Sequence, residues 1–203
     1  MTRSGNETVL NQLADGRWVT CERSLVRISL QDATTVQSLI KEIDMKDVIV
    51  CDLDGTLANC EHRVHHVQKT DGAGLRRKPN WDAFYAGVKD DDANYPVLNL
   101  LHTYLSAEHH YNLIFCSGRP ERCRDDTETW LHEQGFHRGH KARYELLMRK
   151  DGDFRADNVV KQEILDAHIP KDRVLFVLDD RQQVVDMWRR NGLTCFQVAE
   201  GNF

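Results

Sequence analysis

The sequence predicts an α/β fold, a three-layer α/β/α sandwich around a parallel sheet, with a small cap inserted after the first strand. Short apolar, β-favouring runs alternate with amphipathic segments of helical period, a pattern typical of a parallel sheet covered on both faces. A polar spacer too long for a simple crossover follows the first run, and it predicts the cap. The length of 203 residues suits one main domain with an appendage.

Each expected element follows from one of these patterns. The strands are the apolar runs at 48–51, 111–116, 144–148, 174–178 and 193–198. The helices are the amphipathic segments at 97–105, 120–134, 158–167 and 182–190. The main domain is therefore expected to span residues 47–203, with the cap at 59–95. Residues 1–46 form an N-terminal extension of unknown role, with weaker signals for a helix at 8–13, a hairpin within 18–30 and a helix at 32–43.

Composition narrows the function classes. The chain has 27 Lys and Arg against 32 Asp and Glu, a formal net charge of −5, so it is not a protein that coats nucleic acid through overall positive charge. No apolar run reaches about 18 residues, so no membrane span is expected. The N-terminus lacks signal-peptide and transit-peptide features, and the six cysteines include no CxxC pair. We therefore expect reduced thiols and a cytoplasmic location.

Polar residues follow four of the five apolar runs. Asp52 to Leu57 (DLDGTL) follows the first, Ser117-Gly118-Arg119 the second, Arg149 the third and the Asp179-Asp180 pair the fourth. Because the carboxyl ends of parallel strands meet at one edge of a sheet, these groups are expected to converge there. Helix N-caps are an alternative for single residues such as Ser117 or Asp180, but they do not account for the DxDGT turn.

The converging carboxylates predict a cation. Asp52 and Asp54 leave the strand end on one face, and with Asp179 and Asp180 they place up to four carboxylates in one crevice. Such groups repel one another unless a hard, oxygen-preferring ion such as Mg²⁺ neutralises them. The prediction fails if the two acidic pairs lie on opposite rims, or if a lysine head fills the gap in place of a cation.

These motifs, in this order, resemble the haloacid dehalogenase superfamily of phosphotransferases, whose first motif is DxDGT. Residues 179–190 (DDRQQVVDMWRR) and 195–203 resemble the end of the 3′-phosphatase domain of T-even phage polynucleotide kinases. The likeness covers about 48–203 and is loosest in the cap. The chain contains no P-loop, so the kinase half of those proteins is not expected. A bacteriophage origin would place the protein in the host-cell cytoplasm.

The resemblance implies roles for the acidic residues. Asp52 would be the nucleophile that forms an aspartyl-phosphate, and Asp54 would act first as general acid and then as general base. Mg²⁺ would be held by Asp52, by the main-chain carbonyl of Asp54 and by Asp179, with Asp180 acting through water. The sequence leaves open which of Asp179 and Asp180 would bind the ion directly.

The resemblance also implies contacts to the phosphate and to the rest of the substrate. Ser117 and nearby backbone amides would donate to the phosphate from a helix N-terminus at Pro120, and Lys161 would hold both the phosphate and Asp52. Arg119 completes the catalytic set. The implied substrate contacts are Thr56, Arg63, Gly118, Arg149 and Asp157. The i,i+4 spacing of Asp157 and Lys161 also fits a surface helix pair.

The cap is expected to decide the substrate. Arg76, Arg77 and Lys78 are cationic, while Trp81, Phe84 and Tyr85 fit either base stacking or packing against the core. The leading hypothesis is a Mg²⁺-dependent phosphomonoesterase for 3′-phosphorylated ends of DNA or RNA, with 2′,3′-cyclic phosphates as a second substrate. The alternatives are a phosphatase of free nucleoside monophosphates and a non-catalytic module that binds nucleic-acid ends. The oligomeric state is left open.

Overall fold

The computed structural model describes residues 6–12, 18–24, 46–70, 74–107, 111–137 and 144–201, and the chain divides into two units, Met1–Met45 and Lys46–Phe203. The first unit contains β1 (Asn6–Gln12) and β2 (Trp18–Ser24), which pair antiparallel. The helix predicted at 8–13 is therefore wrong, because β-branched Thr8 and Val9 pair with the second strand instead. The hairpin predicted within 18–30 is also wrong, because residues 18–24 form one strand whose partner is β1, and residues 25–30 lie outside the described residues. The helix predicted at 32–43 lies outside them as well.

The second unit is built on a five-stranded parallel sheet. Its strands, in spatial order, are β7 (Tyr144–Arg149), β6 (Asn112–Pro120), β3 (Val48–Cys51), β8 (Val174–Asp179) and β9 (Cys195–Gln197). All five predicted runs form strands. The chain enters at the central β3, builds one side of the sheet and returns to build the other. The carboxyl ends of β3 and β8 thus flank the switch point where ligands of open α/β sheets bind.

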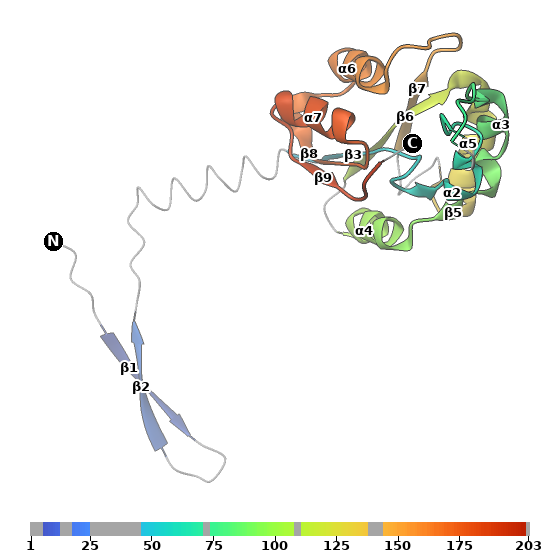
Figure 1. Cartoon of the computed structure of the whole chain (residues 1–203). Helices are drawn as coiled ribbons and strands as arrows, with labels where there is room; N and C mark the ends of the chain where they lie inside the picture. The colour runs from blue at the N-terminus through green and yellow to red at the C-terminus, as the bar shows by residue number, and fades with distance from the viewer. Residues whose placement is uncertain are drawn as a thin grey trace. The chain divides into compact units, whose positions relative to one another are not determined.

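Helices cover both faces of this sheet (Figure 1). One face packs against α4 (Tyr95–Ser106) and α5 (Arg124–Glu133), the other against α6 (Asp157–His168) and α7 (Gln182–Arg190). Strand β3 shows why both faces are apolar: Ile49 and Cys51 join the first layer, and Val48 and Val50 join the second. The three-layer prediction is confirmed.

Strand β6 continues further than the sequence predicts. Pro120, expected to begin a helix, is the last residue of β6, in an extended conformation with φ −69° and ψ 154°. Its fixed φ suits either structure, and here it aligns with Arg149 of β7. A short 3-10 helix, η2 (Glu121–Cys123), then leads into α5. The amides around Gly118 therefore lie at a strand end and not at a helix N-terminus.

The segment between β3 and α4 forms the cap. Its elements are β4 (Ala58–Asn59), α2 (Glu61–Val64), α3 (Trp81–Ala86), the 3-10 helix η1 (Val88–Asp90) and β5 (Asp92–Ala93). Strands β4 and β5 pair antiparallel at its base, and Cys60, Val67 and Phe84 form a small apolar cluster inside it. A further 3-10 helix, η3 (Lys171–Arg173), precedes β8. Among the described residues, no helix is both long and apolar enough to cross a bilayer.

Candidate active site

A tight turn at the end of β3 carries Asp52 and Asp54. Leu53 and Leu57 are fully buried and anchor the turn, while Gly55 takes a left-handed φ of +86° that favours glycine. The backbone N–H of Asp52 donates to the carbonyl of Leu178 at 2.9 Å, which fixes the end of β3 against the end of β8. The turn residue Asp54 therefore stands beside the switch point of the sheet.

Three of the four predicted carboxylates meet there, while Asp54 lies apart from them against two arginines. Asp52, Asp179 and Asp180 each offer a carboxylate oxygen within 4.8 Å of the others, and all three side chains are buried. Thr56 donates to Oδ1 of Asp180 at 3.3 Å. Oδ2 of Asp180 is buried without a hydrogen-bond partner among the residues that the structure describes. Three clustered carboxylates with one unpartnered oxygen are a donor set that suits a hard divalent cation.

Lys161 of α6 lies between the two pairs. Its Nζ is 2.8 Å from Oδ1 of Asp52, 3.0 Å from Oδ2 of Asp179 and 3.5 Å from Oδ2 of Asp157. A lysine head thus lies in the gap, the arrangement that the sequence analysis names as evidence against a cation. The lysine does not neutralise the cluster, because one ammonium against the carboxylates of Asp52, Asp179 and Asp180 leaves a formal charge of −2. That remainder fits a divalent ion beside the lysine.

The pKa values express the same shortage of positive charge. Burial raises the pKa of Asp52 well above its ordinary value, and Lys161 offsets only part of that rise. Burial and the neighbouring Asp179 carboxylate raise the pKa of Asp180 to about 6. The pKa of Asp157 falls despite its burial, because Lys161, Arg181 and Arg149 surround it. The deficit is therefore concentrated where the cation would bind.

Asp54 has the opposite environment. Arg119 donates from Nε to Oδ1 of Asp54 at 2.9 Å, and Nη2 groups of both Arg119 and Arg63 contact the same oxygen. Burial alone would raise the pKa of Asp54, but the two guanidinium groups outweigh it and lower the pKa. About 14% of the Asp54 side chain remains exposed, towards the pocket that it lines.

Asp91, which belongs to no sequence motif, completes this network. Its fully buried carboxylate accepts from Nε of Arg63 at 2.6 Å, from Nη2 of Arg119 at 2.7 Å, and lies 2.9 Å from Nε2 of His62. Two arginines therefore stand between two aspartates, and the four formal charges cancel. Asp91 follows η1 in the cap without any motif around it, so no local signal in the sequence could have marked it.

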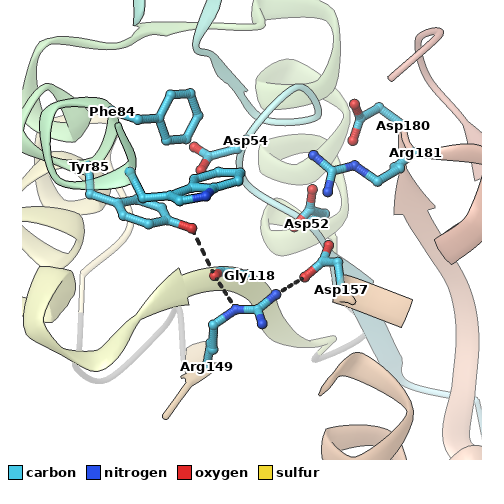
Figure 2. Close-up of a pocket in the computed structure, with 10 residues that line it drawn as sticks. Asp52, Asp54, Phe84, Tyr85, Gly118, Arg149, Asp157, Asp180 and Arg181 are labelled. Atoms are coloured by element: carbon cyan, nitrogen blue, oxygen red, sulfur yellow. Dashed lines mark hydrogen bonds and ion pairs between the residues drawn. The ribbon is translucent and has the colours of Figure 1, made fainter. Parts of the chain in front are cut away.

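The pocket itself lies between the cap and the ends of β3 and β6 (Figure 2). Nε of Arg149 donates to the carbonyl of Gly118 at 2.9 Å, its Nη2 contacts Oδ1 of Asp157 at 3.0 Å, and the Tyr85 hydroxyl donates to the same carbonyl at 3.5 Å. Gly118 is required here because a Cβ would lie 2.5 Å from Oδ1 of Asp157. Arg181 lies on the wall of the pocket opposite Tyr85.

The predicted site residues fall into two groups. Those that line the pocket are Asp52, Asp54, Gly118, Arg149, Asp157 and Asp180. Those buried behind it are Thr56, Arg63, Ser117, Arg119, Lys161 and Asp179. The Ser117 hydroxyl accepts from the Arg119 N–H at 3.2 Å, and the side chains of Arg63 and Arg119 contact Asp54 and Asp91. The cap aromatics Trp81, Phe84 and Tyr85 all line the pocket, and Phe84 is buried.

Two further contacts around the acidic cluster were not expected from the sequence. The indole N–H of Trp188, on α7, donates to Oδ2 of Asp179 at 3.1 Å. Gly201 donates to the main-chain carbonyl of Asp180 at 3.2 Å and packs so closely that a Cβ there would collide with the Asp180 carboxylate. Both residues belong to the segment that carries the resemblance, but spacing alone assigns them no role.

Solved structures of other proteins are similar to this chain. A hydrolase of the haloacid dehalogenase-like family from Streptococcus pneumoniae matches with a TM-score of 0.50 at 15% identity, over 75% of this chain and 84% of that chain, which shows the shared fold. Two structures of the Pnkp1/Rnl/Hen1 complex, one described as an RNA repair complex, each match with a TM-score of 0.58. Their identities are 36% and 32%, over 77% and 92% of this chain. The chain spans only 43% and 55% of those relatives.

Fold and site together define a phosphatase-type domain of the haloacid dehalogenase superfamily. A family model described as the polynucleotide kinase PNKP phosphatase domain matches residues 46–203. The chain belongs to this family of polynucleotide kinase phosphatase domains.

Asp91→Asn tests the buried network. The substitution leaves two buried guanidinium groups opposite a single carboxylate, so we expect the free energy of unfolding in urea to fall by about 3 kcal/mol or more. The control is Asp82→Asn, which removes the exposed partner of Arg122 and should cost less than about 1 kcal/mol. Equal losses in the two variants would show that Asp91 contributes no more than a surface ion pair.

Asp180→Asn tests the charge deficit. Because the folded pKa of Asp180 is about 6 against an ordinary 3.8, ionising it costs stability, and this cost grows as the pH rises from about 4 through 6. Without metal, the variant should therefore be more stable than the wild type at pH 8, by about 1–3 kcal/mol, and equal to it near pH 4. Millimolar Mg²⁺ should stabilise the wild type more than the variant. Exposed Asp172 serves as control through Asp172→Asn, and an unchanged pH dependence in Asp180→Asn would contradict the deficit.

Proposed function

We propose that this domain is a Mg²⁺-dependent phosphomonoesterase that removes 3′-phosphates from polynucleotide ends through an aspartyl-phosphate intermediate. The observation that carries the proposal is the meeting of Asp52 with Asp179 and Asp180 around the ammonium of Lys161. The family match supports phosphoryl chemistry at this cluster. A binding module would gain nothing from a nucleophile held in this position.

Asp52 is the nucleophile in this proposal. One of its carboxylate oxygens attacks phosphorus, an Asp52 O–P bond forms, and the bond from phosphorus to the 3′-oxygen breaks with its electron pair on that oxygen. Asp54 gives the leaving oxygen a proton. Lys161 orients the Asp52 carboxylate through its 2.8 Å contact and offsets part of the charge on the cluster.

Asp54 then completes the reaction. It takes a proton from water, the water oxygen attacks phosphorus, and the Asp52 O–P bond breaks to release inorganic phosphate. The lowered pKa of Asp54 keeps its carboxylate ionised and so available to accept that proton. For the acid step, the incoming phosphate adds negative charge beside Asp54, which raises its pKa and promotes proton uptake. The two steps therefore use the same carboxylate in two electrostatic environments.

Mg²⁺ fits the cluster through the carboxylates of Asp52, Asp179 and Asp180, with the main-chain carbonyl of Asp54 as a further oxygen donor. When bound, the ion supplies positive charge to the phosphoryl oxygens. The surrounding protein contributes a cation of its own, since the guanidinium of Arg149 lines the same pocket. Thr56 holds one oxygen of Asp180 in place.

The substrate class rests on the relatives. Two similar solved structures are of the Pnkp1/Rnl/Hen1 complex, one of them described as an RNA repair complex, and this favours RNA ends as a substrate alongside DNA ends. Opening of 2′,3′-cyclic phosphates is a second reaction of the same proposal. Free nucleoside monophosphates remain the alternative substrates of the same catalytic core.

Asp52→Asn tests the covalent mechanism. Loss of the nucleophile should lower kcat on an activated aryl phosphate by a factor on the order of 10⁴ or more, because no other group can form the intermediate. Asp47→Asn, at the opposite end of β3 and paired with Arg173, is the matched control and should keep normal turnover. Near-normal turnover by Asp52→Asn would exclude the aspartyl-phosphate.

A substrate panel tests the specificity. We expect the highest kcat/KM on a 3′-phosphorylated oligonucleotide, compared with its 5′-phosphorylated counterpart and with 3′- and 5′-mononucleotides, measured as phosphate release in Mg²⁺. The same panel in EDTA should show no turnover. A preference for mononucleotides would transfer the assignment to the alternative, and activity in EDTA would remove the metal from the proposal.

A further inference from the structure

The last described segment of the chain runs beside the acidic cluster. Gln197 ends β9 and pairs in register with Asp179 of β8, and the N–H of Val198 donates to the carbonyl of Asp179 at 3.0 Å. The side-chain amide of Gln197 donates to the carbonyl of Asp180 at 2.9 Å, and the N–H of Gly201 donates to the same carbonyl at 3.2 Å. Residues 197–201, here called the C-terminal clamp, therefore hold the main chain of both aspartates.

Gly201 leaves no room for a side chain. A Cβ on this residue would lie 2.3 Å from Oδ2 of Asp180, and 2.8 Å and 2.9 Å from the Cα and N atoms of Arg181. The φ of Gly201 lies outside the left-handed region, so glycine is required here by space and not by backbone conformation. The atoms of Arg181 belong to the main chain and cannot rotate aside. A larger residue must therefore displace either the clamp or the Asp180 carboxylate.

The contact with Gly201 falls on the Asp180 oxygen that lacks a donor. Oδ1 of Asp180 accepts from Thr56, whereas Oδ2 is buried without a hydrogen-bond partner among the residues that the structure describes. Gly201 covers this oxygen but offers it no side-chain donor, and its own N–H is used on the Asp180 carbonyl. The clamp thus shields Oδ2 from solvent and leaves its lone pairs free.

We propose that Gly201 and Gln197 are positioning residues for the cation site, because they hold Asp180 so that its shielded Oδ2 stays available to a divalent cation. The inference rests on the proposed function and adds two residues that act through Asp180 and not on the substrate. A buried carboxylate oxygen without a donor has lost its hydration, and a bound cation offsets that cost. A displaced clamp admits water to Oδ2 or turns the carboxylate, and either change weakens cation binding.

The test measures binding of Mn²⁺, an ion that carboxylate sites bind as they bind Mg²⁺, to the 203-residue chain without substrate. The free ion is followed by its electron paramagnetic resonance signal, which is lost on binding. In Gly201→Ala the dissociation constant should rise about tenfold or more, the usual effect of disturbing a group that orients a metal ligand. Gln197→Met keeps the length of the side chain without its donor and should raise the constant as well.

Ala199→Ser is the matched control, because it adds one atom at an exposed position of the same clamp and should leave the dissociation constant unchanged. Urea unfolding of the metal-free variants identifies any that fails to fold. If Gly201→Ala does not fold, Gln197→Met takes its place in every comparison. Unchanged Mn²⁺ affinity in the folded clamp variants would overturn the proposal.

A double-mutant cycle distinguishes positioning from a general loosening of the fold. Asp180→Asn alone should weaken Mn²⁺ binding, and adding Gly201→Ala to it should produce little further loss, because the glycine acts through that carboxylate. Effects that multiply in the double variant would show that Gly201 acts independently of Asp180, and would overturn the positioning role.

Phosphate release is measured separately on the same proteins. A wild type that binds Mn²⁺ but releases no phosphate from any substrate of the panel would overturn the proposed function and leave the role of the clamp in place. A wild type that releases phosphate, with clamp variants that bind Mn²⁺ as tightly as it does, would overturn the clamp alone. Failure of the wild type to bind Mn²⁺ would overturn both.

Discussion

Repulsion among carboxylates at the ends of two neighbouring strands is the constraint on which this domain depends. The sheet brings Asp52, Asp179 and Asp180 together, and the helical layer formed by α6 and α7 supplies hydrogen-bond donors to them. Helix α6 contributes the ammonium of Lys161, and α7 contributes the indole N–H of Trp188. These two helices therefore pack against the sheet and also reduce the repulsion among its carboxylates. They leave enough negative charge for a cation to bind.

Two aspartates separated by a single residue acquire different chemistry from their surroundings. Asp52 lies among other acids, and burial raises its pKa, while Asp54 lies against Arg63 and Arg119, which lower its pKa. Residue type is the same in both, so environment alone separates a group that needs a counter-ion from a group that is already neutralised. This division of a carboxylate pair is a common basis for assigning nucleophile and acid–base roles.

The sequence predicted those features of the fold and the site that a local pattern of residues encodes. Continuous apolar runs gave the five strands because a strand buried on both faces has no polar alternation, and the DxDGT turn marked Asp52 and Asp54. Long-range pairing was not encoded in this way: Pro120 extends a strand because it aligns with Arg149, and Asp91 matters only because Arg63 and Arg119 meet it in space. Helical spacing likewise could not distinguish buried Phe84 from exposed Trp81.

The ionic network behind Asp54 also bears on how the cap behaves. Arg63 and Asp91 belong to the cap, while Asp54 and Arg119 belong to the sheet, so the buried charges tie the two together. Opening the cap as a hinged lid would strand these charges without partners. The network therefore opposes a hinged opening and favours a cap that stays seated against the ends of the strands.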